Sequence, residues 1–238
     1  MAQNTQARAL QSQLLPREAP RVPGYDFAYG FQTAADCSGD LFDIFPLDDG
    51  TLALCIADVS GKGMEAARLM SELHTAVRAC APEAESPAEL CTTVNRLVSG
   101  KFAPGKYATM FYGVLSVATG VLCYENAGHC LPVLVRGDGS VDFPASFSGV
   151  LGLFSHWLYR NQEVQLGSGD TLLLVTDGVL DAETRRGQEF GYQRVIAAVQ
   201  EARGSSAAEL GRAILDQVSD FCRGRLRDDA SLIVVKVS

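Results

Sequence analysis

The sequence predicts an α+β fold in which antiparallel sheets carry helices on their outer faces. Two observations support this prediction. Short apolar runs with strand character follow one another, separated by turn signals such as Asp48-Asp49-Gly50. The helical patterns come as two pairs, within residues 64–98 and 192–222, and do not alternate with single strands. This order favours antiparallel pairing over a parallel sheet built from βαβ units.

The strands are predicted from alternation and from short apolar runs. Residues 25–31 place four aromatic side chains on one face, which is a period of two. The other predicted strands cover residues 41–47, 51–57, 108–117, 121–126, 131–136, 161–166, 171–176 and 231–237. Residues 144–157 show no regular pattern.

Helices are predicted where apolar residues recur at helical spacing, at residues 64–80, 86–98, 192–202 and 207–222. Two of these helices open with a serine three residues before a glutamate. The pairs are Ser86 with Glu89 and Ser206 with Glu209, and their spacing is that of a capping box. The sequence therefore indicates where these two helices begin.

The first 24 residues are expected to form an N-terminal linker helix and connection, followed by one large domain at residues 25–238. Residues 2–15 are polar, with Ala7, Leu10 and Leu14 at roughly helical spacing, and Pro16 ends the pattern. Such a helix could pack on the domain or pair with a second copy in a homodimer. A frayed terminus fits the same residues.

Composition narrows the class of protein. Hydrophobic residues make up 47% and charged residues 20%, as in ordinary globular proteins. The net charge of -8 disfavours nucleic acid as a partner. No apolar run is long enough to span a membrane, and the N-terminus lacks the core of a signal peptide. Seven cysteines without a C-x-x-C pair fit a reducing compartment, so we expect a cytoplasmic protein without a membrane partner.

Aspartates stand at the ends of three strand-like runs. Asp58 ends one run, Asp177 ends another, and Asp228-Asp229 precedes the last. Strand ends can bring such side chains to one edge of a sheet, where carboxylates repel one another unless a hard divalent cation neutralises them. The sequence therefore predicts a metal site. Because its candidate ligands are oxygens and not Cys or His, zinc is disfavoured.

Five motifs occur in a recognisable order. They are Cys37-Ser38-Gly39-Asp40, the segment 56–63 (IADVSGKG), Asn126-Ala127-Gly128-His129, Thr176-Asp177-Gly178 with the later Asp228-Asp229, and Gly187-x-x-Phe190-Gly191. In this order the chain resembles the bacterial SpoIIE/RsbU-type serine/threonine phosphatases, a branch of the metal-dependent PPM (2C-type) protein phosphatases. The resemblance covers about residues 11–238.

The resemblance implies a central antiparallel β-sandwich flanked by helices on both outer faces, with two Mn²⁺ or Mg²⁺ ions at one end. Asp58 would bridge both ions and the Val59 carbonyl would bind one of them. Asp177 and Asp228 would bind the second ion, and Asp40 would add a ligand directly or through water. Asp229 would not bind an ion itself and would support the residues that do.

The implied activity is hydrolysis of phosphoserine or phosphothreonine by a metal-activated water, with no protein nucleophile. The implied substrate is a regulatory phosphoprotein such as an anti-sigma-factor antagonist. Many eukaryotic members have a histidine where Ser60 stands, so the general acid is unassigned. A catalytically silent binding module on the same fold, or a metal hydrolase acting on a small phosphate ester, are the alternative functions.

Several other polar residues have two interpretations each. Asp43 is either a further metal ligand or a polar strand residue, and Lys62 either contacts phosphate or is solvated. His129 is expected to be a structural hydrogen-bonding residue. The arginines of residues 223–227 either attract a phosphopeptide or form a solvated basic cluster.

Overall fold

The computed structural model describes residues 15–16, 18–34, 37–48, 50–145 and 148–238. The helix expected over residues 2–15 lies almost entirely outside the described residues. The chain divides into two compact units. The first comprises Met1–Pro16, Asp36–His129 and Ala145–Gln165, and the second comprises Arg17–Ala35, Cys130–Pro144 and Leu166–Ser238. Each unit is described by itself.

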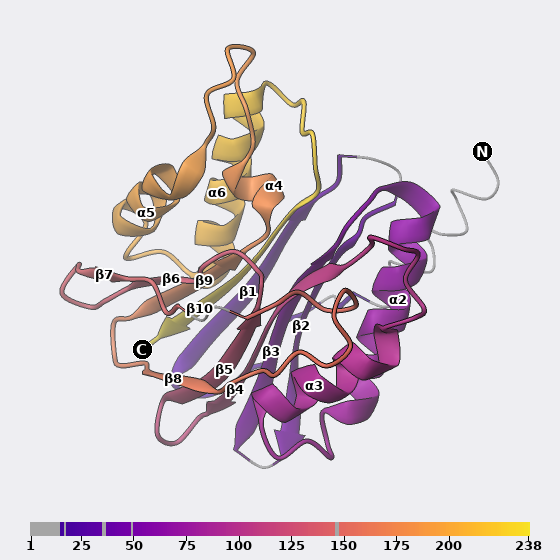
Figure 1. Cartoon of the computed structure of the whole chain (residues 1–238). Helices are drawn as coiled ribbons and strands as arrows, with labels where there is room; N and C mark the ends of the chain where they lie inside the picture. Colours follow the sequence, from indigo (N-terminus) through magenta and orange to yellow (C-terminus); the bar gives the residue numbers. More distant parts are fainter. Residues whose placement is uncertain (1–14, 17, 35–36, 49, 146–147) are drawn as a thin grey trace. The chain divides into compact units, whose positions relative to one another are not determined.

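The first unit is built on a five-stranded antiparallel sheet (Figure 1). In spatial order its strands are β2 (Asp40–Asp48), β3 (Thr51–Val59), β4 (Ala108–Ser116), β5 (Val121–Ala127) and β8 (Gln162–Gln165). Neighbours in this order up to β5 are also neighbours in the sequence, so β2 to β5 form a meander. The turn between β2 and β3 is where the sequence predicted it.

Helices α2 (Gly63–Cys80) and α3 (Pro87–Val98) cover one face of this sheet (Figure 1). Alternate residues of β3, such as Ala53, Cys55 and Ala57, are in one apolar cluster with Leu69 and Leu90 of the helices. Because side chains alternate along a strand, the residues between them face away from the helices. Asp58 is one of these residues.

The second unit contains another five-stranded antiparallel sheet. In spatial order its strands are β1 (Tyr25–Gln32), β10 (Ala230–Val237), β9 (Thr171–Val175), β6 (Val133–Val135) and β7 (Val141–Asp142). The last strand of the chain, β10, therefore lies between β1 and β9. This pairing joins the two ends of the unit.

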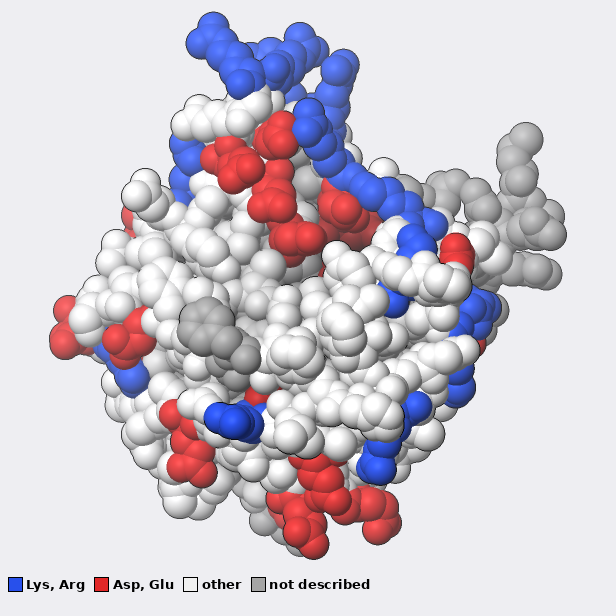
Figure 2. Space-filling model, in the orientation of Figure 1, with Lys and Arg blue, Asp and Glu red and all other residues white. Residues whose placement is uncertain are grey.

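The helices of the second unit are α4 (Asp177–Leu180), α5 (Gly191–Glu201) and α6 (Ala207–Cys222). Leu210, Ile214 and Val218 of α6 are in one buried cluster with Leu232 and Val234 of β10. The predicted capping box opens α6, since Ser206 and Glu209 each bind the other's backbone N–H. Arginine side chains gather where α6 ends and at the chain segment between α4 and α5 (Figure 2).

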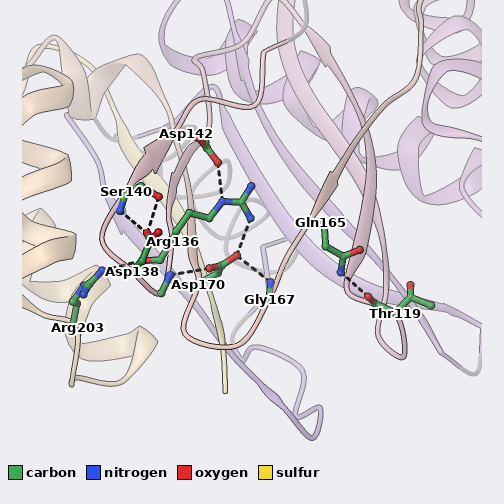
Figure 3. Close-up of polar contacts among 10 residues, drawn as sticks. Thr119, Arg136, Asp138, Ser140, Asp142, Gln165, Gly167, Asp170 and Arg203 are labelled. Atoms are coloured by element: carbon green, nitrogen blue, oxygen red, sulfur yellow. Dashed lines mark hydrogen bonds and ion pairs between the residues drawn. The ribbon is translucent and has the colours of Figure 1, made fainter.

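A polar network closes the other end of the second unit (Figure 3). Arg136 donates from Nε to Asp142 over 2.7 Å and from Nη1 to Asp170 over 2.9 Å. The same Asp170 carboxylate accepts the backbone N–H groups of Gly137 and Gly167. The aspartate thus ties the β6–β7 hairpin to the turn that leads into β9.

The structure confirms the α+β class, because each unit is an antiparallel sheet with its own helices. Within the described residues, the predicted strands and the four helices predicted between residues 64 and 222 all occur, with ends that shift by a few residues. Two short elements, β7 and α4, were missed. No helix of the described residues is long and apolar enough to cross a membrane.

Candidate active site

In the first unit, Asp40 and Asp58 lie directly opposite each other across strands β2 and β3. The Val59 N–H donates to the Gly39 carbonyl over 3.3 Å, so residues 39 and 59 form the hydrogen-bonded pair. Asp40 and Asp58 then form the adjacent non-hydrogen-bonded pair, in which facing side chains are closest. Asp40 is only 2% exposed. Like charges placed directly opposite are destabilising, and a bound cation would remove this cost.

Gly39 leaves room beside this aspartate pair. A Cβ atom at Gly39 would lie 2.8 Å from the Val59 carbonyl oxygen and 3.3 Å from Asp58 Oδ1. Both of these oxygens are predicted metal ligands. The glycine therefore keeps open a space lined by a carboxylate and a carbonyl, which are donors that suit Mg²⁺ and Mn²⁺.

The loop that follows Val59 is tied to the start of β4. The Ser60 N–H donates to the Tyr107 carbonyl over 2.9 Å, and Ser60 Oγ accepts the Tyr107 N–H over 2.9 Å. This pairing brings Lys106 over the loop, with its Nζ atom 2.6 Å from the position of a Cβ on Gly61. An ammonium group there can face a phosphate held at the loop. Lys62, the lysine for which the sequence left a phosphate contact open, is exposed.

Lys106 carries no motif, so the sequence pattern alone does not reveal it. The signal that could have found it is the antiparallel pairing of β3 with β4, in which Val59 is opposite Ala108. Extending this register by two residues places Gly61 opposite Lys106.

His129 is buried and holds structural hydrogen bonds, as predicted. Its backbone N–H donates to Asn126 Oδ1 over 2.7 Å, and its Nδ1 is 2.8 Å from Thr109 Oγ1. Thr109 is the strand partner of Asp58 on β4. The Asn-Ala-Gly-His motif therefore fixes the chain next to the strand that carries Asp58.

Asp43 lies on the opposite face of β2 from Asp40, because three positions separate them. It faces α2, where Arg78 binds both of its carboxylate oxygens over 2.7 and 3.0 Å. His74 Nε2 is 3.1 Å from the same carboxylate. Asp43 is thus the partner of two basic side chains of α2, which decides between its two interpretations in favour of a structural role.

In the second unit, the pairing of β9 with β10 brings the other predicted ligands together. Just past the paired strands, Thr176 N–H donates to the Ser231 carbonyl over 3.0 Å, and Ser231 N–H donates to Thr176 Oγ1 over 2.9 Å. Asp177 follows as the first residue of α4. A Cβ at Gly178 would lie 2.0 Å from the Asp229 carbonyl oxygen, so this turn of α4 packs directly on the backbone before β10.

Asp228 and Asp229 differ in their surroundings. Asp229 is buried, and its Oδ1 accepts the Ala34 N–H over 2.8 Å, while its own N–H donates to Asp228 Oδ1 over 3.0 Å. Asp228 is half-buried. Asp229 thus anchors the chain that carries Asp228, which is the arrangement expected of a supporting residue.

Asp181 is an acidic neighbour that the sequence analysis missed. Burial raises the pKa of Asp181, and the charges of Glu183 and Asp228 raise it further. Its position at the end of α4 depends on a helix too short to show a helical pattern. Glu183 in turn pairs with Arg227 over 2.7 Å.

Within the described part of either unit, no three His, Cys, Asp or Glu side chains are gathered closely enough to hold a metal ion. The predicted ligands of the first unit are Asp40, Asp58 and the Val59 carbonyl, and those of the second unit are Asp177 and Asp228. The donors in both sets are oxygens, which fits a hard divalent cation and not zinc.

Two antiparallel sheets with their own helices, and aspartates at the strand ends, define the PP2C-type phosphatase fold. The SiaA-PP2C domain of Pseudomonas aeruginosa has this fold, with a TM-score of 0.86 and 18% identity over 100% of this chain and 96% of that chain. The family model of Stage II sporulation protein E (SpoIIE) matches residues 48–238. The chain therefore belongs to the SpoIIE family, a branch of the PPM phosphatases.

Two curated relatives match nearly the whole chain. Protein IcfG of Synechocystis is 27% identical over 96% of this chain, and the phosphoserine phosphatase RsbU of Bacillus subtilis is 28% identical over 97%. This chain spans 40% of the length of IcfG and 68% of the length of RsbU. Both relatives therefore contain sequence beyond the part that this chain matches.

Proposed function

We propose that this protein is a metal-dependent serine/threonine phosphatase that hydrolyses phosphoserine or phosphothreonine in a regulatory phosphoprotein. The observation that carries the proposal is the opposed pair of Asp40 and Asp58 beside Gly39. A pair of facing carboxylates, one of them buried, with an adjacent carbonyl oxygen is unfavourable for folding alone and favourable for binding a cation. Residues 25–238 would form the catalytic domain, with residues 1–24 as a linker helix and connection.

Asp40, Asp58, the Val59 carbonyl, Asp177 and Asp228 would hold two Mn²⁺ or Mg²⁺ ions. When bound, the ions would lower the pKa of a water molecule and neutralise charge on the phosphoryl oxygens. The ligands are expected to be held by the strand pairings β2–β3 and β9–β10.

Other residues of the chain would position the ligands and the substrate. Asp229 holds the backbone before β10 through Ala34 and so fixes Asp228. Ser60 fixes the loop after Val59 through Tyr107. Lys106, which lies over this loop, would attract the phosphate of the substrate.

A phosphoprotein substrate is supported by the family and by the named activity of RsbU. The finer proposal, that the substrate is an anti-sigma-factor antagonist in a partner-switching pathway, rests on this likeness. A homodimer through the N-terminal helix stays a prediction, since residues 1–14 lie outside the described residues.

The proposal is tested by Mn²⁺ titration of aryl phosphate and phosphoserine-protein hydrolysis. We expect Asp177→Asn to lower turnover roughly 100-fold or more, because a ligand is lost. Asp216→Asn is the matched control, since Asp216 is exposed on α6 of the same unit. Wild-type protein without turnover on either substrate at any metal concentration would contradict the proposal and favour a silent binding module.

A further inference from the structure

Five arginines form a surface on the second unit, which we call the arginine surface. Arg185 and Arg186 lie on the hairpin of residues 183–189, and Arg223, Arg225 and Arg227 lie on the turn after α6. Figure 2 shows basic side chains projecting from these two segments. The chain has a net charge of -8 and 20 lysines and arginines in all, so this local excess of positive charge stands out against the rest of the protein.

The two segments are held beside each other by specific contacts. Arg227 Nη1 pairs with Glu183 Oε2 over 2.7 Å at the base of the hairpin. Phe190, just after the hairpin, packs edge-on against Phe221 of α6 with ring centroids 5.5 Å apart. The guanidinium of Arg194 lies 4.6 Å from the Phe221 ring centroid. The arginine surface therefore rests on a packed base.

Within the described part of the chain, four of the five guanidinium groups have no carboxylate partner. Arg185, Arg186, Arg223 and Arg225 are exposed, and among the described residues none of them is within 4.0 Å of a carboxylate. Only Arg227 is used in an ion pair that supports the hairpin. The other four are open to an external anion.

Arg223 also has an unfavourable backbone conformation. Its φ of 57° and ψ of 43° are left-handed, and it is the only non-glycine residue with positive φ in the described part of the chain. Glycine is the usual residue at this position after a helix, because a Cβ is disfavoured there. An arginine kept where glycine would be more stable indicates a role other than folding.

We propose that the arginine surface docks an acidic segment of the phosphoprotein substrate, an inference that rests on the proposed function. The turn ends one residue before Asp228, so a protein whose phosphoserine reaches this ligand lies beside the surface. Arginine pairs with carboxylates through two parallel hydrogen bonds. The acidic side chains of Asp177, Asp181 and Asp228 lie next to the surface and disfavour a long polyanion such as nucleic acid.

The test measures binding without divalent metal, so that it does not depend on turnover. The probes are a fluorescein-labelled peptide with one phosphoserine flanked by glutamates and a matched peptide with glutamines. We expect wild-type protein to bind the glutamate peptide more tightly. The combined variant R185Q/R186Q/R223Q/R225Q should lose roughly 10-fold or more of this affinity and little for the glutamine peptide.

Two further variants separate docking from folding. Arg223→Gly should weaken binding of the glutamate peptide while the melting temperature stays equal or rises. Arg212→Gln, which removes an exposed arginine elsewhere on α6, should bind as wild type does.

Equal affinity of wild type for the two peptides, or an equal loss in Arg212→Gln, would overturn the docking proposal. Anionic vesicles and duplex DNA serve as further probes. The proposal would also be overturned if the combined variant lost affinity for these probes and kept its affinity for the glutamate peptide. Absence of aryl phosphate hydrolysis by wild type would contradict the proposed function alone, and arginine-dependent peptide binding would still support the docking surface.

Discussion

Gly39 lies against two of the proposed ligand oxygens. Asp58 Oδ1 and the Val59 carbonyl both border the space that a side chain at residue 39 would fill. Both belong to one strand end, and the Val59 backbone cannot move far without breaking the β2–β3 pairing. A single methyl group is therefore enough to test whether this space holds a metal.

We expect Gly39→Ala to raise the Mn²⁺ concentration needed for half-maximal activity by roughly 10-fold, because the Cβ displaces two ligand oxygens. The measurement is a metal titration of aryl phosphate hydrolysis, with thermal melting to confirm folding. Gly204→Ala is the control, since a Cβ at Gly204 meets no atom within 4 Å. Unchanged metal dependence in a folded Gly39→Ala protein would argue against Val59 and Asp58 as ligands.

At the scale of the element, the two faces of β2 carry aspartates with different roles. Asp40 faces away from the helices and is opposite Asp58. Asp43 faces α2 and binds Arg78 and His74. Helix α2 follows directly on the loop after Val59, so the Asp43 contacts hold the helix that continues from the proposed site.

We expect Asp43→Asn to lower the free energy of unfolding by about 2 kcal/mol, because it leaves Arg78 without a charged partner. The cost stays below that of a fully buried pair, since the Arg78 side chain is 44% exposed. Urea unfolding measures the change. The control is Glu72→Gln in the exposed pair with Arg68, which should cost about 0.5 kcal/mol or less.

Substitutions of Asp40 and Asp43 can distinguish a metal ligand from a structural residue. Asp43→Asn should keep the Mn²⁺ affinity of the wild type, whereas Asp40→Asn should weaken it. An equal effect of both substitutions on Mn²⁺ affinity would contradict the division of roles.

Long helices and strands could be predicted from the sequence. Very short elements, and contacts that depend on tertiary packing, could not. The helix at residues 207–222 was predicted at its observed bounds, since four turns of apolar spacing and the Ser206–Glu209 box agree. Helix α4 and strand β7 were missed, because four and two residues show no period. The same limit applies to contacts. The Asp43–Arg78 pair spans 35 positions and depends on how α2 packs, which no local pattern encodes.

For the candidate site, the order of motifs predicted which aspartates are ligands. The pairing of β2 with β3 explains why Asp40 and Asp58 lie opposite each other. Asp40 and Asp58 are partners across a hairpin, a relation that turn position already implied. The place of Lys106 required the register between β3 and β4, and the support of Asp229 by Ala34 joins residues 195 positions apart. Such contacts follow from tertiary packing and not from composition or spacing.

At the scale of the whole molecule, the proposed ligands are Asp40, Asp58, the Val59 carbonyl, Asp177 and Asp228. Ions bound by these residues would stabilise the protein, because a ligand that binds only the native state stabilises it. At a metal concentration about 100-fold above Kd, this stabilisation is about 2.7 kcal/mol.

We expect Mn²⁺ to slow amide hydrogen exchange at Ser60 in the first unit and at Ser231 in the second, as measured by mass spectrometry. Asp58→Asn should remove the protection in the second unit as well, since coupling between shared ligands is reciprocal. Asp216→Asn should leave both effects intact. If Asp58→Asn left the Mn²⁺ protection at Ser231 unchanged, the ions would not be shared.

The pairing of β9 with β10 has an evolutionary consequence. Hydrogen bonds between Thr176 and Ser231 end the β9–β10 pairing. The positions of Asp177 and Asp228 therefore depend on this pairing and not on the exposed loops of the chain between them. The hairpin tip at residues 185–187 and the turn at 223–225 lie within that intervening stretch. Mutation can therefore change these exposed tips, and with them the proposed docking of the substrate, while the strand pairing that carries Asp177 and Asp228 stays intact. A family built in this way can acquire new specificities without having to rebuild its catalytic centre.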